Sequence, residues 1–195
     1  MCNKMFLLSI MILSSTASFA QKDRLFNIYI ERSKVDFKKP TGYLELDSIL
    51  TLYDGRNGHR TGLSVFNLLS KKDQILICIG FNGIDTSLNS KLKGFPGSGG
   101  GQYDANRNYI PHKLEYELYP TGYAKLKNNA DLAITFALPV NPKYPVLGNF
   151  DKCKCVVLHK ENNVDITIYY YFTRKSEKNL KKHLENTNAM FWFKD

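Results

Sequence analysis

Two β-rich runs follow one another in the segment Cys153–Phe172, CKCVVLHKENNVDITIYYYF. The polar residues Glu161–Asn163 between them predict a hairpin turn. In the second run, side chains alternate between the two faces of a strand, and Val164 shares one face with every second residue up to Phe172. We therefore predict two antiparallel strands over 153–160 and 164–172, with one face against the core.

A short helix should follow this hairpin. Ser176 is a suitable N-cap, and Leu180 and Leu184 have the i, i+4 spacing of one helix face. These features predict a helix from residue 176 to about residue 188. The closing run Met190–Phe193 is too apolar for a free tail, so we expect it to pack back onto the sheet.

Turn residues divide the upstream chain into further elements. Extended segments are expected at Leu25–Ile30, Leu63–Leu69, Gln74–Phe81, Leu114–Tyr119 and Ala130–Leu138. The second and third of these should form a hairpin. The segment Tyr43–Tyr53 fits a helix by its apolar spacing, although its first four residues also fit a strand, and we expect a helix.

The order of these elements favours one α+β domain. Several adjoining strands with helices near the ends are typical of a mainly antiparallel sheet with helices packed on one face. The C-terminal hairpin followed by a helix completes that arrangement. Residues 21–195 have the usual size of a single globular domain, and no internal repeat divides them.

The first twenty residues are typical of an export signal. Lys4 supplies the positive charge, Met5–Leu13 the apolar region, and a tract of small residues ends at Ala20. The apolar region is shorter than the ~20 residues that a membrane-spanning helix needs, so we predict cleavage after Ala20. The mature protein is then expected to be periplasmic or secreted, without a stable membrane span.

The chain is basic, with 27 Lys and Arg residues against 18 Asp and Glu residues. Lys4 is the only charged residue of the predicted signal, so cleavage lowers the formal net charge from +9 to +8. This excess favours a protein or an anionic surface polymer as partner, and export makes nucleic acid unlikely. A soluble basic surface without a partner is the alternative interpretation.

Three cysteines remain after the predicted cleavage: Cys78, Cys153 and Cys155. The odd number leaves at least one thiol unpaired in a monomer, and the apolar surroundings of Cys78 predict a small buried side chain. Cys153, Cys155 and His159 share a strand face and have the ligand types that suit zinc. Because no fourth ligand is evident, we predict no metal site and no cofactor.

The segment Asn82–Tyr109 is rich in Gly, Asn and Ser, which is typical of a long surface loop with a role in recognition. Within it, Gly94–Gly101 lacks the Gly-Lys-Ser/Thr ending of a phosphate loop. Its glycines suit close approach to a partner, and aromatic and basic residues follow them. The candidate binding residues are Gly97, Gly99, Gly100, Tyr103, Arg107, Tyr109 and His112.

A catalytic site is the competing hypothesis. His59 or His112 could act as a base, Asp54 or Asp104 as its partner, and Cys78 or a serine as the nucleophile. No nucleophile elbow or paired zinc-ligand motif supports this assignment. The sequence therefore favours a non-catalytic exported binding protein of the bacterial envelope, such as an immunity-type protein that binds a protein partner. An exported hydrolase or glycan-binding protein acting on a cell-surface polymer is the alternative.

Overall fold

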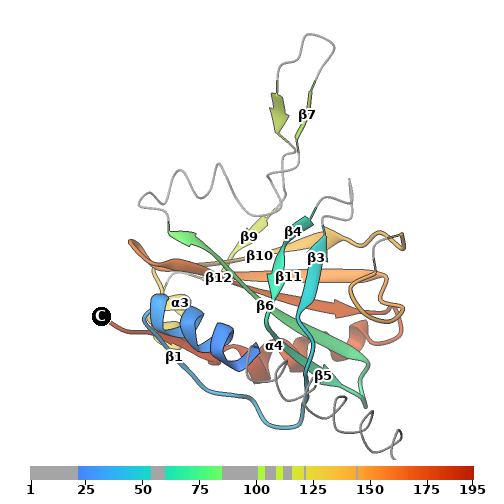
Figure 1. Ribbon diagram of the computed structural model, residues 1–195, viewed down its shortest axis with the longest axis horizontal. Helices are drawn as coiled ribbons and strands as arrows, with labels where there is room; N and C mark the ends of the chain where they lie inside the picture. Colours follow the sequence, from blue (N-terminus) through green and yellow to red (C-terminus); the bar gives the residue numbers. More distant parts are fainter. Residues whose placement is uncertain are drawn as a thin grey trace, which may run out of the picture.

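The computed structural model describes residues 22–53, 60–84, 101–103, 109–111, 116–120, 122–143 and 145–195. A seven-stranded antiparallel sheet forms the centre of the molecule, in the order β2-β5-β6-β12-β11-β10-β9 (Figure 1). Its strands are β2 (Leu44–Leu46), β5 (Phe66–Ser70), β6 (Ile75–Ile84), β9 (Tyr116–Leu118), β10 (Leu132–Pro139), β11 (Lys152–His159) and β12 (Val164–Phe172).

The predicted C-terminal hairpin is confirmed, and it lies in the middle of the sheet. β11 and β12 pair with Cys155 opposite Tyr169, and β12 also pairs with β6. All nine residues of β12 are buried. We expected one face of this strand to meet the core, whereas both faces do, because the sheet is covered on each side.

Three helices in the described part of the chain cover one face of the sheet. They are the helix of residues 22–32, α3 (Tyr123–Asn128) and α4 (Leu180–Thr187), which the short 3-10 turn η1 (Glu177–Asn179) precedes. Phe26, Ala124 and Leu180 from these helices pack in one cluster with sheet residues such as Ile168 and Tyr170. The predicted α+β fold with helices on one face is thus confirmed.

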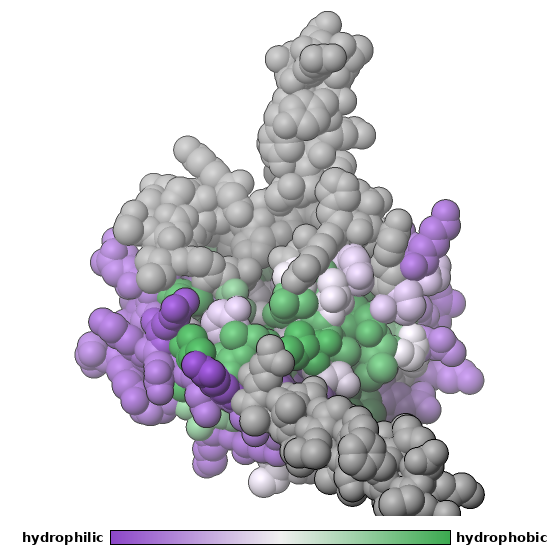
Figure 2. All heavy atoms as spheres, in the orientation of Figure 1, coloured by the Kyte–Doolittle hydropathy of each residue, from purple (hydrophilic) through white to green (hydrophobic). Residues whose placement is uncertain are grey.

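The opposite face of the sheet is covered by β3 (Leu50–Tyr53) and β4 (Arg60–Ser64), which cross in front of it in Figure 1. Leu50 and Leu52 of β3 pack there with Cys155 and Tyr171. The segment between β10 and β11 adds Phe150 and other partly buried apolar residues to the same cluster. Figure 2 shows apolar side chains gathered in the middle of the face that carries β3 and β4.

The C-terminal residues pack back onto the fold as expected. β13 (Phe191–Phe193) pairs with β1 (Val35–Phe37) in a separate two-stranded sheet. Phe191 and Phe193 are fully buried, and Met190 is nearly so. The predictions of the β5–β6 hairpin and of the strand near residues 130–138 are also confirmed, the latter as β10.

The prediction of an extended segment at Leu25–Ile30 is wrong, because these residues belong to the helix of residues 22–32. Phe26, Tyr29 and Ile30 have the i, i+3, i+4 spacing of one helix face, and all three pack against the main core. The β-branched and aromatic residues of this segment favour a strand locally. Tertiary packing outweighs that preference.

The helix expected over Tyr43–Tyr53 is also wrong. The segment forms two short strands instead, β2 and β3, so the alternative strand interpretation of its first residues is the correct one. Ser176 precedes the C-terminal helical region as predicted, but its side chain makes no capping hydrogen bond. No helix in the described part of the chain is long and apolar enough to cross a membrane.

Candidate functional site

The predicted surface loop begins later than expected, because β6 continues to Ile84. Within the predicted binding segment Gly94–His112, the structure describes only β7 (Gly101–Tyr103) and β8 (Tyr109–Pro111). These two strands pair antiparallel, with the backbone of Tyr103 opposite that of Tyr109. Two of the predicted binding residues therefore lie across from each other on a two-stranded sheet. The other predicted binding residues lie outside the described residues: Gly97, Gly99, Gly100, Arg107 and His112.

A groove of about 400 Å³ lies at the end of the main sheet where β5 turns into β6. Leu69 and Phe150, both partly buried, provide its apolar lining. Its polar lining consists of Ser70, Lys71, Gln74, Asn149 and Thr173. A volume of this size lies within the range of small-molecule sites, and the mixture of one apolar patch with several polar groups is typical of them.

Side chains hold the β5–β6 turn that forms one side of the groove. Ser70 Oγ accepts a hydrogen bond from the backbone N–H of Asp73 at 3.3 Å. Ser176 Oγ donates to the carbonyl oxygen of Gln74 at 3.2 Å and accepts from the N–H of Thr173 at 2.9 Å. The turn and the end of β12 are thus joined by a single serine.

One basic residue, Lys71, lines this groove, and three others are its neighbours or those of Thr173 in the sequence. Lys71 and Lys72 lie on the turn, Arg174 and Lys175 directly follow Thr173, and all four are exposed. None of the four forms an ion pair within the part of the chain that the structure describes. The acidic residues nearest to the lining in sequence are Asp73, which His183 engages, and the exposed Asp151.

One described histidine is buried behind the same turn. His183 of α4 is 3% exposed, and its Nε2 lies 2.9 Å from Asp73 Oδ2 while its Nδ1 lies 2.7 Å from Tyr43 Oη. The hydrogen bond with His183 lowers the pKa of Asp73, and burial raises the pKa of Tyr43. Because both ring nitrogens have internal partners, His183 holds α4 to the turn and is not free to bind substrate.

The other described histidine is His159, at the end of β11. It is 3% exposed, its Nδ1 lies 2.9 Å from Asp165 Oδ1 on β12, and its buried Nε2 has no hydrogen-bond partner. A nucleophile would have to lie within hydrogen-bonding distance of that nitrogen for the pair to act as in a catalytic triad. No described hydroxyl or thiol does.

The three described cysteines are free and buried. Cys153 and Cys155 lie on one strand face with their sulfur atoms 3.9 Å apart. Burial raises the pKa of the Cys78 and Cys155 thiols well above the usual value. The prediction of a small buried side chain at Cys78 is confirmed, and its burial makes Cys78 unsuitable as a nucleophile.

The zinc-type ligand set considered for Cys153, Cys155 and His159 is not assembled. His159 lies four positions after Cys155 on the strand, which places their Cα atoms about 13 Å apart. No group of three or more potential metal ligands occurs among the described residues. The remaining catalytic candidates, His59, Asp54 and Asp104, lie outside the described ranges.

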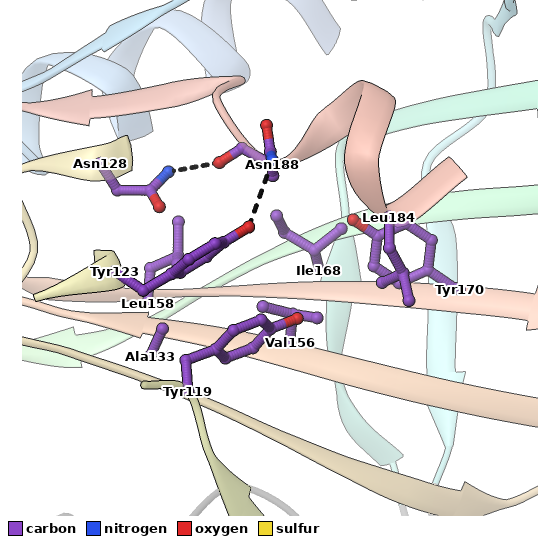
Figure 3. A pocket seen from close by; sticks show the side chains of 10 residues that line it. All are labelled: Tyr119, Tyr123, Asn128, Ala133, Val156, Leu158, Ile168, Tyr170, Leu184 and Asn188. Atoms are coloured by element: carbon purple, nitrogen blue, oxygen red, sulfur yellow. Dashed lines mark hydrogen bonds between the residues drawn. The ribbon is translucent and has the colours of Figure 1, made fainter. Parts of the chain in front are cut away.

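A smaller cavity, of about 20 Å³, lies between α3, α4 and the sheet (Figure 3). Asn128 Nδ2 donates to the carbonyl oxygens of Asn188 and Phe191 at 2.8 and 2.9 Å, whereas Asn128 Oδ1 is buried without a partner. Burial raises the pKa of Tyr119, which also lines the cavity, to about 12. The volume admits a single water molecule and excludes an organic ligand.

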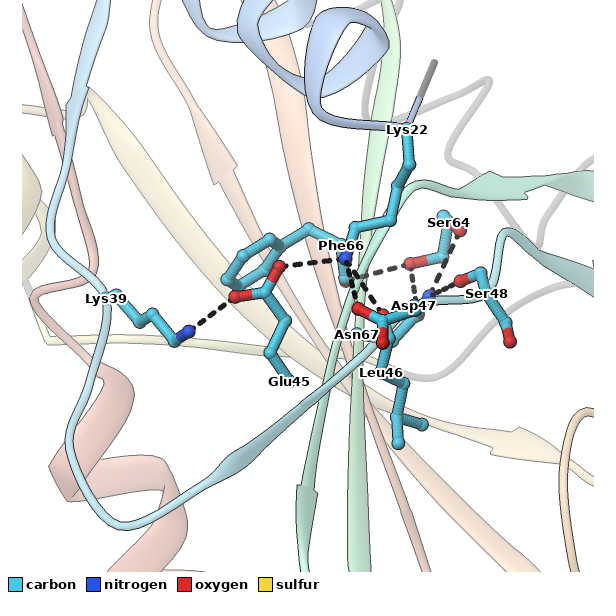
Figure 4. Close-up of polar contacts among 9 residues, drawn as sticks. All are labelled: Lys22, Lys39, Glu45, Leu46, Asp47, Ser48, Ser64, Phe66 and Asn67. Atoms are coloured by element: carbon cyan, nitrogen blue, oxygen red, sulfur yellow. Dashed lines mark hydrogen bonds and ion pairs between the residues drawn. The ribbon is translucent and has the colours of Figure 1, made fainter. Parts of the chain in front are cut away.

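An ion-pair network anchors the start of the 22–32 helix (Figure 4). Lys22, which is 2% exposed, places Nζ 2.8 Å from Glu45 Oε1 and 3.0 Å from the carbonyl oxygen of Leu46, and Lys39 contacts the other oxygen of Glu45. Burial alone would raise the pKa of Glu45. The hydrogen bonds from the two lysines have the larger combined effect, so the pKa of Glu45 lies below its usual value. The network stabilises the fold, since each lysine ammonium in it contacts a carboxylate of opposite charge.

No protein-family model matches the chain, and no curated protein matches it either. The groove at the β5–β6 turn was not predicted from the sequence. The signal for it is weak: Lys71 and Thr173 each stand directly after a strand, but only the order of strands in the sheet brings those two strand ends to one place.

Proposed function

We propose that the protein is an exported, non-catalytic binding protein whose partner in the bacterial envelope carries anionic groups. The observation that carries this proposal is the contrast between the histidines and the groove. His159 and His183 are buried and paired with carboxylates inside the fold, while the open groove is lined by hydroxyl, amide and ammonium groups. These groups suit the binding of a ligand, and neither described histidine is free to act on that ligand as a base.

The N-terminal sequence supports export. Every described helix and strand lies after Ala20, so cleavage at that position removes none of them. The anionic character of the partner follows from the excess of basic side chains, since a net charge of this sign attracts acidic surfaces and raises the rate of their capture. The partner is a surface polymer or, as for an immunity-type protein, another protein.

A capture experiment tests this proposal. Purified residues 21–195 are mixed with a polysaccharide fraction and, separately, with the proteins of the envelope of the source cell, at low and high salt. We expect capture from one fraction that weakens as salt rises, because charge contributes to it. The size of the polysaccharide should stay constant on gel filtration. Shortening of the polymer would instead show a hydrolase, and capture from neither fraction would overturn the proposal.

A matched pair of variants separates specific capture from general basicity. The double variant K71S/R174S removes two charges beside the groove, and K125S/K127S removes two from exposed positions on α3. We expect the first to weaken capture more than the second. Deleting Gly97–Gly101 tests the predicted loop independently, because its contribution to capture does not depend on the groove.

A further inference from the structure

We infer that the groove at the β5–β6 turn binds an anionic sugar unit of a saccharide chain. This inference rests on the proposed function and assigns its ligand class and its site. The groove opens at the end of the sheet, with the β5–β6 turn, the segment at Asn149–Phe150 and Thr173 around it. Its volume of about 400 Å³ suits a small ligand or one short stretch of a longer chain.

The lining matches a sugar ring in having both apolar and polar parts. Phe150 and Leu69 are partly buried and supply aromatic and aliphatic carbon to the lining, which suits the C–H groups of a ring. The side chains of Gln74 and Asn149 are exposed and each combine two N–H donors with a carbonyl acceptor. Amides of this kind suit hydroxyl groups, which both donate and accept hydrogen bonds.

The charges around the groove select an anionic sugar over a neutral one. Lys71 lines the groove, and Arg174 and Lys175 follow Thr173. Asp73 is the acid closest to Lys71 in sequence, and it is already hydrogen-bonded to His183 and Asn179. Asp151, which directly follows the lining residue Phe150, is an exposed acid, so three basic residues at or next to the lining stand against one exposed carboxylate. A carboxylate or phosphate on the sugar therefore meets an excess of cations, and hydrogen bonds between charged groups are the stronger kind.

The turn that carries this lining is held in place before any ligand arrives. Gln74 has φ of +51°, in the left-handed region that non-glycine residues rarely adopt. The hydroxyl of the buried Ser176 lies 3.2 Å from the carbonyl oxygen of Gln74 and 3.2 Å from that of Thr173, so it holds the turn next to the end of β12. A ligand that binds here loses little affinity to ordering of the protein, because the side of the groove is already formed.

The test compares three probes with purified residues 21–195 by isothermal titration calorimetry: trigalacturonate, neutral galactotriose and inorganic phosphate. We expect binding of trigalacturonate that is at least about tenfold tighter than that of galactotriose, the difference that one charged hydrogen bond contributes. Equal binding of the acidic and neutral sugars, or binding of neither, would overturn the inference. Binding of phosphate as tight as that of trigalacturonate would also overturn it, because the site would then recognise an anion and not a sugar.

Two variants locate the site. Lys71→Ser removes the lining cation, and Gln74→Gly removes the lining amide at a position whose φ favours glycine, so the fold should be retained. Lys71→Ser should weaken trigalacturonate binding roughly tenfold and Gln74→Gly roughly fivefold, while K125S/K127S leaves it unchanged. If the wild type captures an envelope fraction but both groove variants bind trigalacturonate as it does, the groove assignment fails and the proposed function stands. Failure of the wild type to capture any fraction overturns both.

Discussion

The Nε2 atom of His183 lies 2.9 Å from Asp73 Oδ2, and this contact joins α4 to the β5–β6 turn across 110 positions of sequence. An ionised carboxylate can only accept hydrogen bonds, so Nε2 carries the proton and donates it. Nδ1, the other ring nitrogen, lies 2.7 Å from the hydroxyl of Tyr43 and shares a hydrogen bond with it. One imidazole therefore ties three distant segments together.

Replacing Asp73 with Asn should destabilise the protein at neutral pH. The hydrogen bond from His183 lowers the pKa of Asp73 in the folded state, so its stabilising effect is fully present above the unfolded pKa of about 3.9. The effect is lost as the pH falls through the lower, folded value. Urea unfolding at a series of pH values should show that the difference between wild type and Asp73→Asn is largest near pH 7 and shrinks in acid.

Asp151→Asn is the control for this change, because it removes the same charge from an exposed position close to the same end of the sheet. It should leave the free energy of unfolding at pH 7 nearly unchanged. An equal loss in both variants would assign the effect to net charge and contradict a role for the contact with His183.

Replacing Glu45 with Gln should destabilise the protein by about 1–3 kcal/mol. The change removes the closest carboxylate from the buried ammonium of Lys22 and leaves only Asp47, whose Oδ1 lies 3.7 Å away, and a poorly compensated buried charge is costly. Glu45 is 25% exposed, which reduces the effect below that of a fully buried pair. Urea unfolding at pH 7 measures the loss.

Lys39→Ala is the matched control, because this lysine contacts the same carboxylate but is 49% exposed. Its loss should cost about 0–1 kcal/mol, the usual value for a surface ion pair. If Lys39→Ala were as destabilising as Glu45→Gln, burial of Lys22 would not be the cause.

The C-terminal hairpin could be predicted from the sequence because its information is local. Alternating side chains and a polar turn lie within twenty consecutive residues, and the structure pairs β11 with β12 as expected. The 22–32 helix was not predicted because the residue types of this segment favour a strand, whereas their packing against the core stabilises a helix. Phe26 stacks on Phe66 of β5 at a centroid distance of 4.6 Å, a contact that no local pattern contains.

The short strands β2 and β3 were missed for a related reason. β2 pairs with β5 and β3 pairs with β4, so each is stabilised by a partner that lies later in the chain. The groove is less predictable still, since Leu69, Phe150 and Thr173 come together only through the order of strands in the sheet. The sequence patterns predict the strands around the groove, but they do not predict which strands lie next to one another in the sheet.

Replacing Gly80 with Ala should destabilise the protein by about 1–3 kcal/mol, the usual cost of overfilling a packed interior. A Cβ atom at this position of β6 would lie 3.1 Å from the ring of Tyr169 on β12. Tyr169 is buried and has little room to move.

Gly62→Ala on β4 is the control, because nothing lies within 4 Å of its added atom, and its free energy of unfolding should be unchanged or slightly raised. Similar losses in the two variants would rule out the contact with Tyr169 as the cause.

The buried thiols should be unreactive in the native protein. Cys78, Cys153 and Cys155 are free and buried, and burial raises the pKa of the Cys78 and Cys155 thiols, so little reactive thiolate is present at neutral pH. Titration with Ellman's reagent under non-reducing conditions should detect no thiol in the native protein purified from the source cell and three after unfolding in guanidinium chloride. Rapid reaction of any thiol in the native state would contradict the burial of the cysteines. A fourth thiol after unfolding would show that Cys2 remains and would contradict cleavage after Ala20, whereas fewer than three would show a disulfide where the structure has free thiols.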